Sequence, residues 1–558
     1  MMILNEIYKR LELADDCLVR LSDPNWKNKV SFPSRIYRLL ETNDLLKDMD
    51  AFFCFDNKPL ILFFKEPKDK QALHRAIWNF NESPIAVIIE NNAVEIYNGF
   101  IFNKTKKLLE HLGGKEYLND FEYFKLVTGK TWEKYQEQLS HKNRVDYKLL
   151  CNIKVAQELL KEQGLSQSLA NKLIGKIIFY RYLIDRQVTL NYQGKEHWTN
   201  EDLCLCLSNK DDFFAFVLYL ENRFNGDMFQ IDQNDYQKIS QSALNVLCRL
   251  LKSEDLISGQ QSLFNIYDFS ILPIEFISNV YEKFIGVDKQ DEESAYYTPT
   301  FLVDYIVAET VGKKLSADET NYNCRILDPS CGSGIFLVES LRRIIEKYKK
   351  VENITETNTE LFREGLRQLV LKNIYGIDKD YDAIQVAIFS IYLTLLDYQE
   401  PADIEKFQFP PLYGINLICS DTFDTNDKGL NNLKNIIFDY IIGNPPWKGA
   451  GGNELAKNYL KNRRQKENHL KNKIAVNNNE LAEYFVFRVS DFCHKETEIA
   501  LIIHSTSLYN SKDGVSDFRK YLLDTFLIKQ ITELSCVRKE VFDKPNDKDT
   551  DSSIAPAC

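Results

Sequence analysis

The 558-residue sequence has no long hydrophobic run, no cysteine framework and no cluster of histidines. Its best apolar candidate, residues 383–396, is shorter than the roughly 20 residues that cross a bilayer, so it predicts a buried helix and no membrane partner. The first ten residues carry charge too early for a signal peptide. The 12 cysteines are scattered, and so are the seven histidines. These absences exclude a disulfide scaffold, predict no metal site, and favour a cytoplasmic protein with reduced thiols.

An excess of basic charge is also missing, because 70 basic residues face 81 acidic ones and the formal net charge is -11. This balance argues against a chain covered in nucleic-acid contacts, although a local basic groove stays compatible with it. The hydrophobic share of 44% provides ample core. The length predicts roughly three or four domains.

Residues 1–120 read as a small α/β domain. Two strand-like runs, 51–55 and 60–64, flank a turn, and runs at 85–89 and 93–97 repeat the arrangement, so two hairpins are expected.

Residues 121–290 read as a helical domain. Leucine, isoleucine, phenylalanine and tyrosine recur at helical spacing in segments such as 149–164 and 169–186, and glycine and proline are sparse.

Residues 291–558 alternate strand-like and helical runs, which predicts an α/β fold with a Rossmann-like, doubly wound parallel sheet. Ligands of such sheets bind beyond the carboxyl ends of the strands. The runs are 325–327, 335–348, 374–377, 381–397, 415–418, 436–442 and 499–503.

A glycine-rich turn, Asp-Pro-Ser-Cys-Gly-Ser-Gly at 328–334, follows the first of these strands. Gly332 and Gly334 allow a ligand to approach the backbone closely. Position 337 is leucine, so the third glycine of the dinucleotide fingerprint is missing and a pyrophosphate ligand is disfavoured. Asp328 would suit a cationic ligand such as the amino and sulfonium groups of S-adenosylmethionine. Alone, the turn is a weak signal.

Two further acids follow the next two strands. Asp378 is placed to accept hydrogen bonds from two ribose hydroxyls, and Asp421 to accept one from an adenine amino group. Either residue alone could be a helix cap or a solvated aspartate. Three acids after three successive strands, beside a glycine turn, form a much stronger pattern.

The fourth feature is Asn-Pro-Pro-Trp at 444–447, after the strand that ends at residue 442. The prolines fix the backbone and remove two amide donors, which leaves the side-chain oxygen of Asn444 and the carbonyl of Pro445 as acceptors for an NH2 group. Trp447 offers a face for stacking a base, worth about 1–3 kcal/mol. A proline turn with Trp447 in the core is the structural alternative.

The order of these four motifs resembles that of the DNA amino-methyltransferases with cofactor motifs first (the gamma arrangement), as in the large single-chain type IIG-like restriction–modification enzymes. Residues 295–299 resemble the Tyr-Thr-Pro motif of that class, and residues 170–175 and 179–183 resemble its helical domain. The resemblance implies an S-adenosylmethionine pocket formed by Tyr297, Thr298, Pro299, Asp328, Ser330, Gly332, Gly334, Asp378 and Asp421. It implies a target site formed by Asn444, Pro445, Pro446 and Trp447, with Phe542 as a second stacking aromatic.

The implied activity is site-specific methylation of N6 of a flipped adenine in double-stranded DNA, within a restriction–modification or phage-defence system. Adenine is favoured over cytosine because the turn begins with Asn444. Methylation of protein glutamine or RNA is an alternative, although those enzymes usually end the turn in tyrosine. A catalytically silent DNA-binding subunit is another.

A basic segment follows the turn. Residues 448–473 hold eight basic and two acidic residues, a net of +6. Lys448, Arg463 and Arg464 are candidate contacts to the DNA backbone, and a solvated helix face is the alternative.

The two ends of the chain raise separate expectations. In the class it resembles, the N-terminal domain is often a nuclease with Asp, then Glu-x-Lys; here Asp50 is followed by Phe63 and Lys65, and phenylalanine cannot ligate magnesium. We therefore expect a degenerate nuclease-like or accessory domain. Residues 554–558 look like an incoming strand cut short, which predicts a truncated chain and a separate or missing target-recognition domain; a frayed tail is the alternative.

Overall fold

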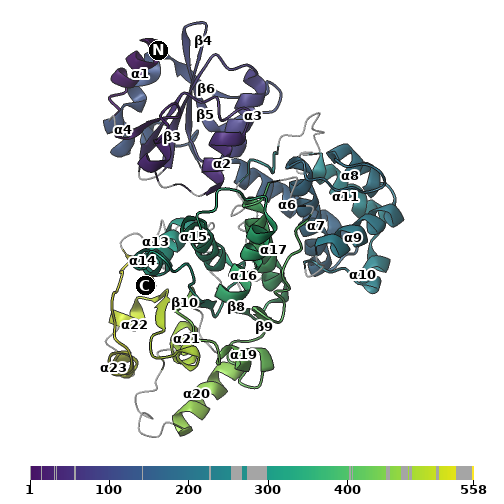
Figure 1. The fold of residues 1–558 in the computed structure, drawn as a ribbon, viewed down its shortest axis with the longest axis vertical. Coiled ribbons are helices and arrows are strands. Elements are labelled where there is room, and N and C mark those ends of the chain that lie inside the picture. The colour runs from purple at the N-terminus through teal and green to yellow at the C-terminus, as the bar shows by residue number, and fades with distance from the viewer. Residues whose placement is uncertain are drawn as a thin grey trace. The chain divides into compact units, whose positions relative to one another are not determined.

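The structure is a computed structural model (Figure 1). The chain divides into two compact units. The first unit comprises Met1–Phe214 and Asp232–Phe276, and the second comprises Ala215–Ile231 and Ile277–Cys558. The boundaries expected at residues 120 and 290 stay a prediction. The structure describes residues 2–13, 16–30, 32, 34–55, 58–140, 143–224, 228–252, 267–272, 298–400, 404, 406–447, 453–466, 476, 480–509, 515–535 and 556–557.

A six-stranded sheet forms the centre of the first unit, and its strands lie side by side in chain order. Neighbouring strands are antiparallel except for β3 and β4, which are parallel and joined by helix α3. Both hairpins expected from the sequence are confirmed, as β2–β3 and β4–β5. The strands are β1 (Leu18–Arg20), β2 (Ala51–Phe55), β3 (Lys58–Lys65), β4 (Ile85–Glu90), β5 (Ala93–Asn103) and β6 (Leu108–Gly114), and α3 spans Lys70–Phe80.

Phe63 lies in the core beneath this sheet. Its side chain is 0% exposed, and its ring meets the ring of Tyr8 edge-on with centroids 5.0 Å apart. Asp50 lies beside it through a hydrogen bond from its amide to the carbonyl of Phe63, 3.0 Å, and burial raises the pKa of its carboxyl group. In the described part of the chain no three histidine, cysteine, aspartate or glutamate residues are grouped to hold a metal. The degenerate-nuclease interpretation stays a prediction.

Helices follow the sheet in this unit, and the two long helical segments expected from the sequence are confirmed as α6 (Val145–Glu162) and α7 (Gln167–Asp185). Ser166 caps α7 by accepting a hydrogen bond from the amide of Leu169, and Gly164 ends the turn before it with a φ of 87°. No helix among the described residues is long and apolar enough to cross a membrane. The other helices here are α1 (Met2–Arg10), α2 (Ser34–Thr42), α4 (Tyr123–Val127), α5 (Lys130–Lys134), α8 (Asn200–Leu207), α10 (Gln233–Lys238) and α11 (Gln241–Leu251), the 3-10 turns η1 (Trp26–Lys29) and η2 (Lys115–Phe121), and α9 (Lys210–Phe224), which crosses the unit boundary.

The second unit contains a five-stranded parallel sheet of order β11-β10-β7-β8-β9, which confirms the predicted fold class. The order reverses between β7 and β10, so the chain leaves these neighbouring strands toward opposite halves of the sheet. Such a switch point opens a crevice at the carboxyl ends of the strands. The strands are β7 (Ile326–Asp328), β8 (Ile374–Asp378), β9 (Leu417–Cys419), β10 (Tyr440–Gly443) and β11 (Glu498–Leu501).

Helices cover both faces of this sheet (Figure 1). Alternate strand residues such as Leu327 and Ile377 join the core formed with α19, α20, α21 and α23. Gly376 faces the other way, where an added Cβ would lie 2.9 Å from Leu337 of α15, so its missing side chain lets α15 pack closely. The helices are α13 (Thr300–Val307), η4 (Ala308–Gly312), α14 (Lys313–Ala317), α15 (Ile335–Val351), α16 (Glu360–Asn373), α17 (Tyr381–Asp397), α19 (Lys428–Leu433), α20 (Glu454–Lys466), α21 (Leu481–Val489), η8 (Ser490–Phe492), α22 (Thr506–Tyr509) and α23 (Val515–Thr525).

A short antiparallel pair extends the chain beyond β11. Strand β12 (Ile503–His504) pairs with β13 (Pro556–Ala557). The strand-like character expected at residues 554–558 is therefore confirmed for its two described residues.

Candidate functional site

The glycine-rich turn links β7 to α15, as its sequence predicts. Gly332 and Gly334 have φ angles of 51° and 84°, values that side chains with a Cβ rarely adopt. Asp328 is 1% exposed, and its Oδ1 accepts a hydrogen bond from the amide of Ser330, 3.0 Å. Among the described residues, Ser330 Oγ is shielded from solvent and has no hydrogen-bond partner. The turn thus presents a carboxylate and a hydroxyl at the switch point.

Asp378 ends β8 directly beside this turn. Its Oδ2 accepts the amide of Gly332, 3.0 Å, and its Oδ1 accepts the amide of Asp380, 2.9 Å. Burial raises the pKa of Asp378 to about 6, and the two amide hydrogen bonds oppose that rise. This carboxylate therefore titrates just below neutral pH.

The loop after β9 carries Asp421. Its Oδ1 accepts the amide of Phe423, 2.9 Å, and its Oδ2 accepts the side-chain amide of Asn453, 3.1 Å. The next residue, Thr422, donates its hydroxyl to the carbonyl of Pro329, 2.6 Å. The loop of Asp421 is thereby attached to the loop of Asp328, although β8 lies between their strands.

The turn at 444–447 follows β10, next to the glycine-rich turn. A Cβ on Gly443 would lie 2.7 Å from Asp328 Oδ1, so the carboxylate occupies the space that glycine leaves. Asn444 Nδ2 donates to the hydroxyl of Thr298, 3.1 Å, and Pro299 precedes helix α13. The structure therefore brings together three segments that are distant in the sequence.

Trp447 is 6% exposed. Its indole N–H donates to the carbonyl of Ile502, 3.1 Å, and its ring meets that of His504 edge-on, with centroids 6.2 Å apart. Burial lowers the pKa of His504, and the amide of Thr506 donates to its Nδ1, 3.2 Å, so the neutral ring carries its proton on Nε2. The indole is fixed against the end of β11, and its role in stacking stays a prediction.

Helix α20 lies within the basic segment, and its arginine contacts differ from the expectation. The Arg463 guanidinium donates to the hydroxyls of Ser490, 2.7 Å, and Tyr521, 3.2 Å, and to the carbonyl of Phe487. These internal contacts weigh against a phosphate contact by Arg463, because its donors are engaged. Lys461 and Lys466 are exposed on the same helix, and Arg464 is half-buried. Three expected site residues, Tyr297, Lys448 and Phe542, lie outside the described residues.

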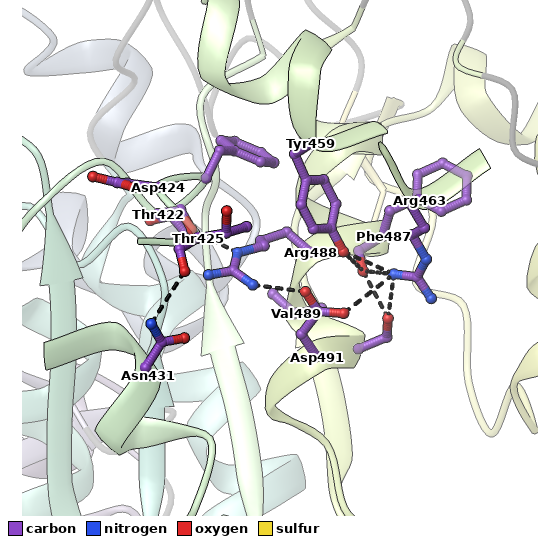
Figure 2. Close-up of polar contacts among 12 residues, drawn as sticks. Thr422, Asp424, Thr425, Asn431, Tyr459, Arg463, Phe487, Arg488, Val489 and Asp491 are labelled. Atoms are coloured by element: carbon purple, nitrogen blue, oxygen red, sulfur yellow. Dashed lines mark hydrogen bonds and ion pairs between the residues drawn. The ribbon is translucent and has the colours of Figure 1, made fainter. Parts of the chain in front are cut away.

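Sequence reasoning missed three residues of this site. Asn453 bonds Asp421, Thr422 joins two loops, and Arg488 of α21 donates from Nε to the carbonyl of Thr422, 2.6 Å (Figure 2). One signal was available: Arg488 is the basic residue in the otherwise apolar run 484–489. A charge in such a run is expected to have a specific buried partner.

Residues 372–542 match the family described as Eco57I restriction-modification methylase. This segment is a restriction-modification methylase domain. It contains Asp378, Asp421, the turn at 444–447 and Arg488, and the glycine-rich turn lies upstream of it.

Two curated relatives place the methylase domain among restriction–modification methyltransferases. The type II restriction enzyme and methyltransferase RM.Eco57I of Escherichia coli is 27% identical over 344 residues, which cover 54% of this chain and 32% of that protein. The type II methyltransferase M.BanIII of Aneurinibacillus aneurinilyticus is 29% identical over 160 residues, which cover 28% of this chain and 23% of that protein. The chain spans less than a third of the length of either relative.

Among solved structures, the type IIL restriction-modification enzyme MmeI in complex with DNA matches with 13% identity and a TM-score of 0.45. The match covers 73% of this chain and 56% of that chain.

Proposed function

We propose that this chain is a DNA methyltransferase that transfers a methyl group from S-adenosylmethionine to N6 of an adenine rotated out of double-stranded DNA. One observation carries the proposal: Asn444 lies at the switch point, with its amide oriented by Thr298 and with Asp328 packed against the preceding glycine. Because Nδ2 points to Thr298, Oδ1 is the acceptor end of the amide, as binding of a target NH2 group requires.

The residues around the switch point fit S-adenosylmethionine. Gly332 and Gly334 adopt left-handed conformations that bring backbone close to a ligand, and Ser330 Oγ is a shielded polar atom without a partner in the described chain. Asp328 would hold the positive methionine end together with Thr298 and Pro299, and the Tyr-Thr-Pro motif adds Tyr297 to this set as an expectation from the sequence. Asp378 would accept the ribose hydroxyls, and Asp421 the adenine amino group.

When bound, the cofactor supplies an electrophilic methyl group on a sulfonium. The chain itself orients the target. Asn444 Oδ1 and the carbonyl of Pro445 accept the two N–H groups of the target amine, and Pro446 keeps a competing donor out of the turn. Stacking on Trp447, with Phe542 as a second aromatic, would offset part of the few kcal/mol that rotating a base out of DNA costs, roughly.

The test is a methyl-transfer assay with tritiated S-adenosylmethionine and duplex DNA, RNA and protein acceptors, followed by digestion and separation of methylated nucleosides. We expect label in N6-methyladenine from duplex DNA. Asn444→Ala should lower kcat at least about 100-fold, as loss of a placed polar group does in other active sites. Binding of S-adenosylhomocysteine should change by less than about twofold, because the cofactor contacts remain.

The matched control is Asn431→Ala, because Asn431 bonds the carbonyl of Thr425 and lies outside the turn. Label in N4-methylcytosine, on RNA or on protein glutamine would replace the proposed substrate. Absence of label with every acceptor, despite bound cofactor, would overturn the proposed function.

A further inference from the structure

Arg488 is a fully buried charged group that contacts a loop of the proposed cofactor pocket. Its side chain is 0% exposed, and it lies in α21 among apolar residues. Nε donates to the carbonyl of Thr422, 2.6 Å, and Nη1 donates to Asp491 Oδ2, also 2.6 Å (Figure 2). A buried guanidinium requires such partners, and here one of them is the main chain of a site loop.

That carbonyl connects Arg488 to two carboxylates of the site. Thr422 directly follows Asp421, and its hydroxyl donates to the carbonyl of Pro329, which directly follows Asp328. Strands β7 and β9 are second neighbours in the sheet, so their ends are roughly 10 Å apart. Arg488 and Thr422 therefore hold together two loops that the sheet itself does not join.

The plane of the guanidinium is fixed as well as its position. Its Cζ lies 4.7 Å from the ring centroid of Phe492 and 5.3 Å from that of Tyr459. A lysine could reach the carbonyl of Thr422 or the carboxylate of Asp491, but its single ammonium lacks the planar fork that serves both between two rings. Arginine is thus specifically required for this arrangement.

We propose that Arg488 is a positioning residue which, through Thr422, sets Asp421 to accept the exocyclic amino group of the cofactor's adenine. The inference rests on the proposed function. In this proposal Arg488 and Thr422 determine cofactor specificity. They fix the distance between the carboxylate of Asp328, which holds the methionine end, and that of Asp421, which binds the adenine amino group.

A second arginine shows what a purely structural role would look like. Arg463 also bonds inside this core, to Phe487, Ser490 and Tyr521. It shares two neighbours with Arg488 (Figure 2): its Nη1 lies 3.6 Å from Asp491 Oδ1 and donates to the hydroxyl of Tyr459, 2.9 Å. Replacing Arg463 should weaken packing without moving Asp421. The two arginines therefore form a matched pair.

The experiment measures the dissociation constants of S-adenosylhomocysteine and S-inosylhomocysteine with the 558-residue chain by calorimetry. The inosyl ligand replaces the amino group with a carbonyl, which a carboxylate at Asp421 would repel. The wild type should prefer the adenosyl ligand by about 100-fold, because a site built to accept a hydrogen bond rejects an analogue that lacks the donor. Arg488→Lys and Thr422→Val should each lower that preference below about tenfold.

Three further variants separate positioning from stability. Thr422→Ser keeps the hydroxyl and should therefore retain the wild-type preference for the adenosyl ligand. Thr425→Val changes an exposed neighbour in the same loop. Arg463→Lys disturbs the same core from the side of Asp491, Ser490 and Tyr521, so both variants should keep the preference even if melting temperature falls. If Arg488→Lys does not fold, Thr422→Val, which is nearly isosteric, carries the test.

The outcomes are distinct. A preference that falls only in Arg488→Lys and Thr422→Val supports the inference. Equal weakening of both ligands in these variants, or no preference in the wild type, overturns the inference and leaves the proposed function standing. A wild type that binds neither ligand overturns the proposed function, and the inference falls with it.

Discussion

Both sheets of this chain have charged residues at the ends of strands, but the two sheets bring different strand ends together. In the first sheet Asp50 precedes β2 and Lys65 ends β3. Because these strands are antiparallel neighbours, the two residues lie at the same edge, where burial raises the pKa of Asp50 and the charge and backbone amide of Lys65 act to lower it. In the second sheet every neighbouring pair is parallel, so Asp328 and Asp378 end adjacent strands at one edge. A parallel sheet gathers the carboxyl ends of all its strands at one edge, whereas an antiparallel pair brings the carboxyl end of one strand to the amino end of its neighbour.

The space beside those ends differs too. In the first sheet Phe63 fills it, next to Tyr8. In the second sheet the carboxylates themselves fill it beside glycines: Asp328 occupies the space that Gly443 leaves, and Gly332 donates its amide to Asp378. An acid at the end of a strand therefore indicates a site more strongly when glycines, and not aromatic rings, lie beside its carboxylate.

The largest expected effect would come from the first sheet. Phe63→Ala should lower the free energy of unfolding of that unit by about 3–5 kcal/mol, because it removes a fully buried aromatic ring. Affinity for S-adenosylhomocysteine should stay within about twofold, since the core that contains Phe63 consists of residues of the first unit alone. Hydrogen exchange of the β3 and β4 amides at increasing urea concentrations measures the free energy of unfolding of this unit. Calorimetry measures the affinity for S-adenosylhomocysteine.

Phe55→Ala is the matched control for this change, because Phe55 is the same residue type at the end of β2 and is 40% exposed. It should cost less than about 1 kcal/mol. Equal losses in the two variants, or a tenfold loss of cofactor affinity in Phe63→Ala, would contradict the contrast between the sheets.

A smaller effect is expected from pH at the second sheet. Burial raises the pKa of Asp378 from its ordinary value to about 6, so the carboxylate that would accept the ribose hydroxyls becomes protonated as pH falls through 6. Affinity for S-adenosylhomocysteine should weaken by about tenfold between pH 7.5 and pH 5. Because the folded state holds this proton more tightly than the unfolded chain, the group's contribution to stability decreases as pH rises from about 4 to 6.

Asp378→Asn supplies the control for this titration. The variant should bind more weakly at pH 7.5 and should lose the pH dependence over this range, because the amide does not titrate. Calorimetric titrations at several pH values give both curves. A variant whose affinity still falls tenfold toward pH 5 would assign the dependence to another group.

Much of this fold follows from local pattern, and the site only in part. The four motifs located the ends of β7, β8, β9 and β10 to within one residue, because glycine, proline and acids mark the ends of apolar runs. The sequence did not predict that β11 ends at Leu501, with a separate β12 after it, since periodicity cannot locate such a break. Nor did it predict the hydrogen bonds from Asn453 to Asp421 and from Arg488 to the carbonyl of Thr422, because these contacts depend on how α20 and α21 pack.

The smallest expected effect concerns the basic segment. Its side chains look equivalent in the sequence, but the structure separates internally bonded ones from exposed ones. The donors of Arg463 are engaged internally, whereas Lys461 and Lys466 are exposed on α20. If the exposed lysines neutralise DNA phosphates, Lys461→Gln with Lys466→Gln should reduce the slope of log affinity against log salt by about 1.8, or 0.9 for each contact. Fluorescence anisotropy with a duplex at several salt concentrations measures that slope.

The matched control removes two exposed lysines from the other edge of the same unit. Lys350 lies at the end of α15, and Lys495 precedes β11, so both are at the amino ends of the strands, away from the turn at 444–447. Lys350→Gln with Lys495→Gln changes the net charge by the same amount and should leave the slope within about 0.3 of the wild type, because only phosphates contacted locally release counterions. Equal slopes in the two double variants would show that net charge, and not the position of α20, sets the attraction to DNA, and the basic segment would then be a solvated helix face.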